Sequence, residues 1–84
     1  MDKEEIIAKL QSIFIKFFDD STLKLKTNLS AKDVSGWDSL NHVRLIFEIE
    51  KFFNIKFFNS EINNTENVGD LVNIIYSRLS KKQK

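Results

Sequence analysis

The absence of proline and the presence of only two glycines most constrain what this chain of 84 residues can fold into. Proteins built from short strands and tight turns need both residue types, because these residues supply the backbone conformations of turns. Apolar residues instead recur at three- and four-residue spacing through much of the chain, which is typical of amphipathic helices. We therefore predict an all-α fold.

The periodicity predicts a small four-helix bundle, with three main helices, one short helix and a long first loop. The helices are expected at about 2–18, 39–53, 61–64 and 68–79, with an extended apolar stretch at 55–58. Asn54 suits a left-handed C-cap after the second helix, and Asn67 a cap before the last. Between the first two helices, we expect a long ordered loop (19–38) that is pinned to the core by apolar side chains: Leu23, Leu25, Leu29 and Val34.

Composition removes several classes of function. Without cysteine there is no thiol nucleophile, disulfide framework or thiolate zinc site, and the one histidine, His42, does not make a His-based metal site. A net charge of +1 is too small for the basic field of a nucleic-acid-binding domain. No apolar run approaches the roughly 18 residues of a membrane span, and the acidic start is unlike a signal peptide. We expect a monomeric, cytoplasmic, single-domain protein.

The second predicted helix carries two apolar stripes. At about 100° per residue, the core-facing stripe contains Leu45, Ile46, Ile49, Phe52 and Phe53. The other stripe, roughly opposite, has charged neighbours and consists of Leu40, Val43 and Phe47 beside Arg44, Glu48 and Lys51. A chain this short has too little protein to bury both stripes. We interpret the second as an exposed docking strip; the alternative is that the long loop or the first helix covers it.

Ser39 stands where this helix starts, next to Asp38, and both residue types are good N-caps. On local chemistry a plain cap is the simpler role for Ser39. A modified hydroxyl is the alternative, because a phosphate ester there would lie at the positive end of the helix dipole. A hydrolytic triad of Asp38, Ser39 and His42 lacks an evident oxyanion site and cleft. We therefore predict no catalytic residues and no enzyme.

Residues 36–40, Gly-Trp-Asp-Ser-Leu, followed by an amphipathic helix that ends at Phe53, resemble the acyl carrier protein family. In that family, Asp-Ser-Leu marks the serine that receives 4′-phosphopantetheine, here Ser39 flanked by Asp38 and Leu40. Residues 68–70, Val-Gly-Asp, are similar to the family's element at the start of the last helix, at the usual distance from the serine. The resemblance covers nearly the whole chain. It implies a carrier protein domain at 1–80, followed by a basic, disordered tail at 81–84.

The resemblance implies a carrier that catalyses nothing itself. A phosphopantetheinyl transferase would move 4′-phosphopantetheine from coenzyme A to Ser39, and the thiol of this arm would hold acyl groups as thioesters. Further partners would be the enzymes that load, modify and transfer the acyl group. The family's acyl pocket would map to Leu45, Ile49, Phe57, Ile62 and Leu71, whose other role is core packing. Because Phe57 and Ile62 are bulky, we expect a small cavity that shelters long acyl chains poorly.

The sequence departs from the family in its charge. Carriers of fatty-acid synthesis are usually acidic along the helix after the serine, whereas here Asn41, Arg44 and Lys51 accompany Glu48 and Glu50. Complementary charge governs partner choice, so we hypothesise a specialised carrier in a lipid or secondary-metabolite pathway. AT-rich codon usage is another explanation for the lysines and asparagines. Two other functions stay open: an aminoacyl or D-alanyl carrier, and a helical interaction module that never carries the arm.

Overall fold

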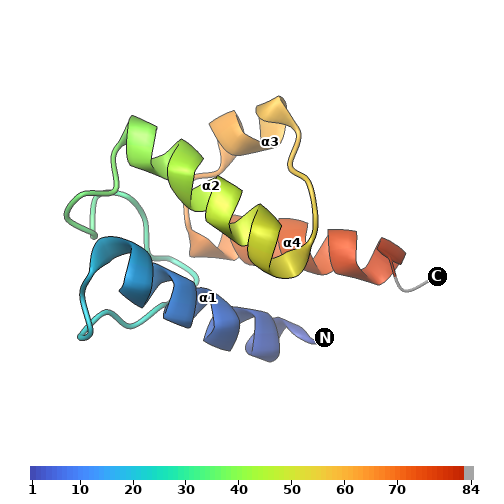
Figure 1. Cartoon of the computed structure of the whole chain (residues 1–84), viewed down its shortest axis with the longest axis horizontal. Coiled ribbons are helices and arrows are strands. Elements are labelled where there is room, and N and C mark those ends of the chain that lie inside the picture. Colours follow the sequence, from blue (N-terminus) through green and yellow to red (C-terminus); the bar gives the residue numbers. More distant parts are fainter. Residues whose placement is uncertain (83–84) are drawn as a thin grey trace.

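A computed structural model describes residues 1–82. This part of the chain forms the helices α1 (Lys3–Phe18), α2 (Ser39–Phe53), α3 (Asn59–Asn64) and α4 (Val68–Lys82). α1 and α2 lie at the front of Figure 1, α4 passes behind them, and α3 lies across the top. α1 packs against both α2 and α4. The predicted all-α bundle is confirmed.

The ends of the helices follow from short local signals. Asp2 caps α1, where its carboxylate accepts a hydrogen bond of 2.8 Å from the Glu5 N–H. The Glu5 carboxylate accepts in return from the Asp2 N–H at 3.4 Å, which completes a capping box. Asn54 ends α2 in the left-handed conformation, with φ 56° and ψ 51°, as predicted. Asp19 ends α1 in the same way.

The core lies between α1, α2 and α4. Each of these helices turns an apolar stripe inward, and nine of the described side chains have no exposed surface: Ile6, Leu10, Phe14, Leu45, Ile46, Ile49, Val68, Leu71 and Ile75. Burying one such side chain stabilises the fold by about 1.5–3 kcal/mol. The apolar residues that recur at helical spacing in the sequence therefore form the core that stabilises the bundle.

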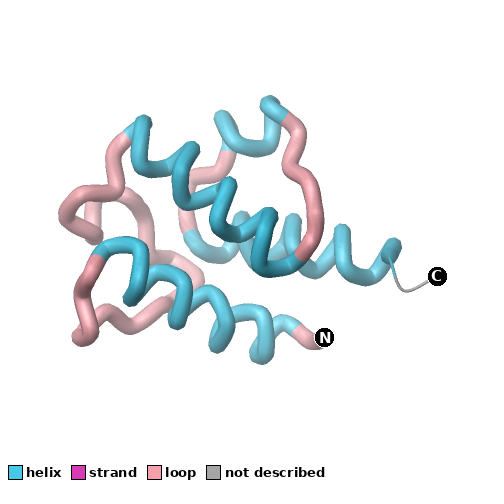
Figure 2. The backbone as a smooth tube through the Cα atoms, viewed as in Figure 1, coloured by secondary structure: helices cyan, strands magenta, loops and turns pink. Residues whose placement is uncertain are grey.

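The long loop between α1 and α2 is ordered against this core, and Figure 2 shows it as the long pink segment at one end of the molecule. Leu25, Val34 and Trp37 are buried, and Leu23 and Leu29 pack against the core. The prediction that apolar side chains pin this loop is confirmed. The loop therefore holds the residues before α2 in a fixed position.

The loop also caps the start of α4 with its backbone. Val68 N–H donates to the Leu29 carbonyl at 2.9 Å, and Gly69 N–H donates to the Thr27 carbonyl at 2.8 Å. A Cβ on residue 69 would lie 3.1 Å from that Thr27 oxygen, so the close approach favours glycine. Asn67 caps the helix as predicted, because its side-chain oxygen accepts from the Asp70 N–H at 3.0 Å. The Val-Gly-Asp element thus joins the loop to α4.

α3 differs from α1, α2 and α4 because none of its residues is fully buried. It begins at Asn59, and the Glu61 carboxylate accepts from the Phe58 N–H at 2.8 Å. Arg78 of α4 forms an ion pair with Glu61, donates to the Lys56 carbonyl at 3.2 Å and lies 4.8 Å from the Phe58 ring centroid. These contacts fasten the start of α3 to α4.

Two predictions about the helices are wrong. Phe52, expected in the core, is 55% exposed, because it lies at the edge of the apolar stripe where α1 leaves room beside it. α4 continues to Lys82, beyond the predicted end at 79, so residues 81 and 82 are helical rather than part of a tail. Residues 83 and 84 of the predicted tail lie outside the described residues.

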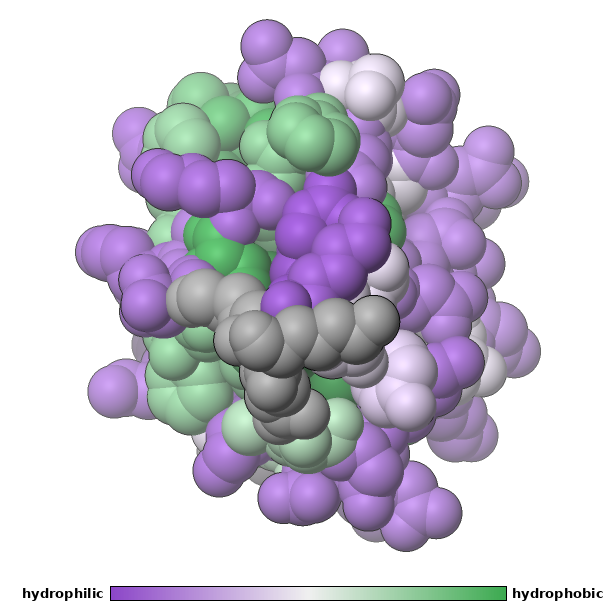
Figure 3. Space-filling model, turned by 90° about the vertical axis from the view of Figure 1, so that its right-hand side faces the viewer, coloured by the Kyte–Doolittle hydropathy of each residue, from purple (hydrophilic) through white to green (hydrophobic). Residues whose placement is uncertain are grey.

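The surface of the described part mixes apolar and polar side chains. Figure 3 looks onto the end where α1 begins and α4 ends, and shows separate hydrophobic patches between hydrophilic ones. Across residues 1–82, no helix has the length and apolar character needed to traverse a lipid bilayer.

Candidate functional site

Ser39 is the first residue of α2, and its side chain is exposed. The cap of this helix is Asp38, whose backbone is extended and whose carboxylate accepts from the Asn41 N–H at 2.8 Å. The interpretation of Ser39 as the N-cap is therefore wrong, because the preceding residue already fills that position. Within the described part of the chain, the Ser39 hydroxyl has no hydrogen-bond partner. It is thus free to react at the positive end of a helix.

A tight turn before α2 presents Ser39 outward. Gly36 has φ 89°, a conformation that side-chain-bearing residues rarely adopt. The next residue, Trp37, returns to the core. The Asn41 side-chain amide donates to the Gly36 carbonyl at 2.7 Å and so ties the turn to the first turn of α2. The serine is therefore displayed from a rigid support.

His42 joins three parts of the molecule beside Ser39. Trp37 Nε1 donates to His42 Nδ1 at 3.0 Å, and the two rings stack with centroids 6.0 Å apart. Since Nδ1 accepts this hydrogen bond, the ring proton resides on Nε2, which donates to the Ile62 carbonyl of α3 at 3.0 Å. Both ring nitrogens are engaged, so His42 is a packing residue and is not a base for Ser39.

A hollow of about 310 Å³ opens beside Ser39. Loop 19–38, the start of α2 and the residues around α3 contribute its walls: Ala31, Trp37, Asp38, Ser39, His42, Ile62, Asn63, Thr65 and Glu66. The predicted acyl-pocket residues Leu45, Ile49 and Leu71 are fully buried, and Phe57 is 8% exposed. Of the five residues predicted for that pocket, Ile62 alone lines this hollow. The acyl pocket stays a prediction.

The second stripe of α2 is exposed, as expected. Leu40 is 63% exposed, Val43 37% and Phe47 53%, so neither the long loop nor α1 covers them. We keep the name docking strip for these three residues.

The charges beside the docking strip are not all equally available to a partner. Glu48 forms an ion pair of 3.0 Å with Lys51. The Glu50 carboxylate accepts from the Phe57 N–H at 2.7 Å and so fixes the segment after α2. Arg44 has no carboxylate partner among the described residues. Arg44 is therefore available to pair with an acidic group of a partner.

Sequence reasoning missed the Trp37–His42–Ile62 contact and the Asn41–Gly36 hydrogen bond. The spacing of Trp37 and His42, on either side of the helix start, was the only local signal for the first. The site offers no metal centre: in the described region, no group of three or more His, Cys, Asp or Glu side chains gathers closely enough to hold an ion.

The helical bundle, with an exposed serine at the start of α2, fits the class of small carrier domains, and the comparisons with known proteins agree. No protein-family model matches the chain. An acyl carrier protein of Borreliella burgdorferi (strain ZS7) is 33% identical over 78 residues, which cover 93% of this chain and 98% of that protein. One from Cyanidium caldarium is 31% identical over 80 residues, covering 95% and 93%.

Solved structures give the same answer. The solution structure of the holo acyl carrier protein from Geobacter metallireducens has a TM-score of 0.86 and 38% identity, with 92% of this chain and 88% of that chain covered. The crystal structure of the acyl carrier protein from Thermotoga maritima has a TM-score of 0.83, at 23% identity, with 96% and 94% covered; this likeness shows the fold. The chain belongs to the acyl carrier protein family. Proteins of this family carry acyl groups and are not enzymes.

Proposed function

We propose that this chain carries acyl groups as thioesters on a 4′-phosphopantetheine arm attached to Ser39. The observation that supports this most is the exposed, unpartnered Ser39 hydroxyl beside a helix cap that Asp38 already provides. A serine that neither caps the helix nor packs in the core has no structural role that requires a hydroxyl at this position.

The surroundings of Ser39 fit a phosphate ester. The N–H groups of Ser39 and Leu40, in the first turn of α2, have no acceptor among the described residues. Unpaired N–H groups at a helix N-terminus favour a bound anion. When bound, the arm supplies a thiol, which a chain without cysteine lacks. Asp38 and Leu40 flank the attachment point, where Asp38 holds the helix start in place.

The transfer itself needs an enzyme. A phosphopantetheinyl transferase would form the bond between Ser39 Oγ and the phosphorus of phosphopantetheine, while the nucleotide part of coenzyme A leaves and the serine loses its proton. Within this chain, both nitrogens of His42 are occupied, so His42 is not the base that removes the proton. The docking strip, with Arg44, Glu48 and Lys51 at its edge, is the surface that we assign to this enzyme and to those that load, modify and transfer acyl groups. The cytoplasm, where coenzyme A is available, is the compartment that we expect.

Intact mass tests the proposal. The apo protein is incubated with coenzyme A and a broad-specificity phosphopantetheinyl transferase and then weighed by mass spectrometry. We expect one phosphopantetheine increment in the native chain and none in Ser39→Ala. No increment in the native chain would favour the alternative of a helical interaction module. Loading of the holo protein with amino acids but not with acyl groups would favour the aminoacyl or D-alanyl carrier.

A specialised pathway is the finer part of the proposal. Arg44 has no carboxylate partner among the described residues, and Arg44 and Lys51 offset the charges of Glu48 and Glu50, so the docking face is less acidic than that of the carriers of general fatty-acid synthesis. We expect the chain to fail in a host that lacks its housekeeping carrier. The double variant Arg44→Glu and Lys51→Glu should improve growth, and full complementation by the native chain would contradict specialisation.

A further inference from the structure

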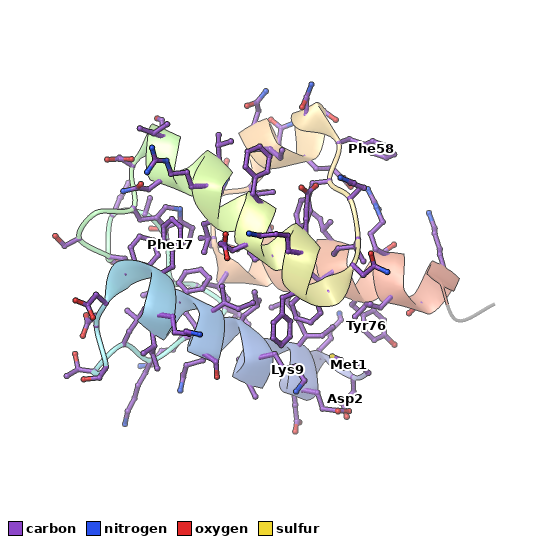
Figure 4. All side chains as sticks on the ribbon, in the orientation of Figure 1. Met1, Asp2, Lys9, Phe17, Phe58 and Tyr76 are labelled. Atoms are coloured by element: carbon purple, nitrogen blue, oxygen red, sulfur yellow. The ribbon has the colours of Figure 1, made fainter. Side chains whose placement is uncertain are left out.

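An open groove of about 630 Å³ runs between α1 and α2, away from Ser39. Its lining comes from both helices: Ser12, Ile13, Lys16, Phe17, Glu48, Lys51 and Phe52. Ile13 and Phe17 of α1 and Phe52 of α2 give it apolar walls, and Figure 4 shows Phe17 on the side of α1 that faces α2. Phe52 is the residue that the helical pattern predicts in the core and that the fold leaves 55% exposed.

This groove adjoins the docking strip at Lys51. A second hollow of about 460 Å³ lies beside Phe47, and Lys51 lines both hollows. Single exposed apolar residues are normal on a protein surface, but a contiguous apolar surface with a polar rim marks a site of interaction. The apolar residues of the docking strip and of the groove therefore lie on either side of the ion pair between Glu48 and Lys51.

The charges around this surface favour an acidic partner. Lys16, Arg44 and Lys56 have no carboxylate partner among residues 1–82. The residues that line the two hollows include three lysines, Lys16, Lys51 and Lys56, and two carboxylates, Glu48 and Glu50, so positive charge is in excess. A partner that brings carboxylates is therefore attracted to this surface more than a basic partner.

We propose that the α1/α2 groove is a second docking site, and that its occupant is an acidic amphipathic helix of an enzyme that visits Ser39. The groove spans residues 12–17 of α1 and 48–52 of α2, which at about 1.5 Å per residue is roughly 6–8 Å. That length accommodates apolar side chains one helical turn apart. An apolar side chain of the partner helix packs beside Phe52, and a carboxylate of the same helix, about one turn away, pairs with Lys16. The inference rests on the proposed carrier function, because the partner is an enzyme that acts on the arm.

Photo-crosslinking of the full-length holo protein in its native cells tests this inference. The photoreactive residue p-benzoylphenylalanine replaces Phe52 in the groove and, in a second variant, Phe47 in the docking strip. A matched control replaces Phe58, which is 66% exposed and lies at the start of α3, far from Phe17 in Figure 4. Far-UV circular dichroism confirms that each variant is folded, and tandem mass spectrometry sequences the crosslinked peptide.

We expect positions 52 and 47 to capture the same enzyme, through peptides in which an apolar residue stands within one helical turn of Asp or Glu. Lys16→Glu should weaken the adduct at position 52 by about fivefold or more, while Lys16→Arg should preserve it.

Several results would overturn the inference. An adduct at position 47 without one at position 52 would support the docking strip as a binding surface and contradict the groove as a second docking site. Capture of a second copy of this chain, crosslinked peptides without carboxylates, or an equal adduct at position 58 contradict the proposed occupant. The absence of adducts at both 47 and 52 contradicts both surfaces, while the intact-mass test on Ser39 decides the carrier function separately.

Discussion

Asp38 and Ser39 are neighbours in the sequence, but replacing Asp38 should lower the stability of the fold whereas replacing Ser39 should leave it unchanged. The Asp38 carboxylate accepts a hydrogen bond of 2.8 Å from the Asn41 N–H, whereas the Ser39 hydroxyl has no partner in the described chain. Replacing a capping Asp by Ala costs about 1 kcal/mol. In a domain of this size, that loss lowers the melting temperature by about 4–8 °C. Ser39→Ala removes no hydrogen bond, so its melting temperature should stay within about 2 °C of the native value.

Thermal unfolding followed by far-UV circular dichroism measures both changes on the apo protein. Asp38→Asn serves as the matched control, because asparagine caps a helix about as well as aspartate. Only Ser39→Ala should lose phosphopantetheine while it keeps full stability. A loss of stability in Ser39→Ala as large as that in Asp38→Ala would refute the assignment of the cap, and with it the argument that the serine is kept for modification.

Three further changes test other parts of the account. Phe53→Ala should lower the free energy of unfolding by about 3–5 kcal/mol because Phe53 is buried, whereas Phe52→Ala should change it by about 0.5 kcal/mol or less. Urea unfolding measures both variants. Equal losses of stability would contradict the exposed position of Phe52. His42→Ala leaves the buried indole N–H of Trp37, the only tryptophan in the sequence, unpaired. The variant should therefore lower the free energy of unfolding by about 1–3 kcal/mol and change the tryptophan fluorescence. An unchanged fluorescence spectrum would count against the hydrogen bond between Trp37 and His42. The side-chain and backbone hydrogen bonds from Thr22 lower the pKa of Asp20. This contact therefore stabilises the turn at pH values above the ordinary Asp pKa, and the stabilisation is lost as the pH falls through the lowered pKa of Asp20. Thr22→Val should raise the pKa of Asp20 measured by carboxyl NMR, and an unshifted titration would show that Thr22 does not lower this pKa.

Local signals in the sequence predict most of the helices. Asp2 and Asn67 cap where their residue types allow, and Asn54 ends α2 in the left-handed conformation. Apolar spacing predicts the buried faces of α1 and α4 because each stripe meets another helix. Such signals succeed where the cause is confined to one turn of the helix.

The errors arise where a neighbouring element decides. Phe52 lies on the predicted core stripe, but burial at the edge of that stripe depends on how closely α1 packs against α2. The spacing of apolar residues within α2 gives no information about that distance. Ser39 and Asp38 are equally good caps by residue type, and the backbone of the Gly36 turn selects Asp38. The spacing of Trp37 and His42 is a local signal for their contact, but His42 and Ile62 are 20 residues apart, so no local pattern reveals the hydrogen bond that joins α2 to α3.

The central claim is that Ser39 carries the arm, and the native protein tests it most directly. The chain is purified from its own cells and digested, and the peptides around α2 are sequenced by tandem mass spectrometry. The account predicts phosphopantetheine on Ser39 and on no other serine of the chain. A peptide with unmodified Ser39 in protein from growing cells, or an arm on Ser30 or Ser35, would contradict it.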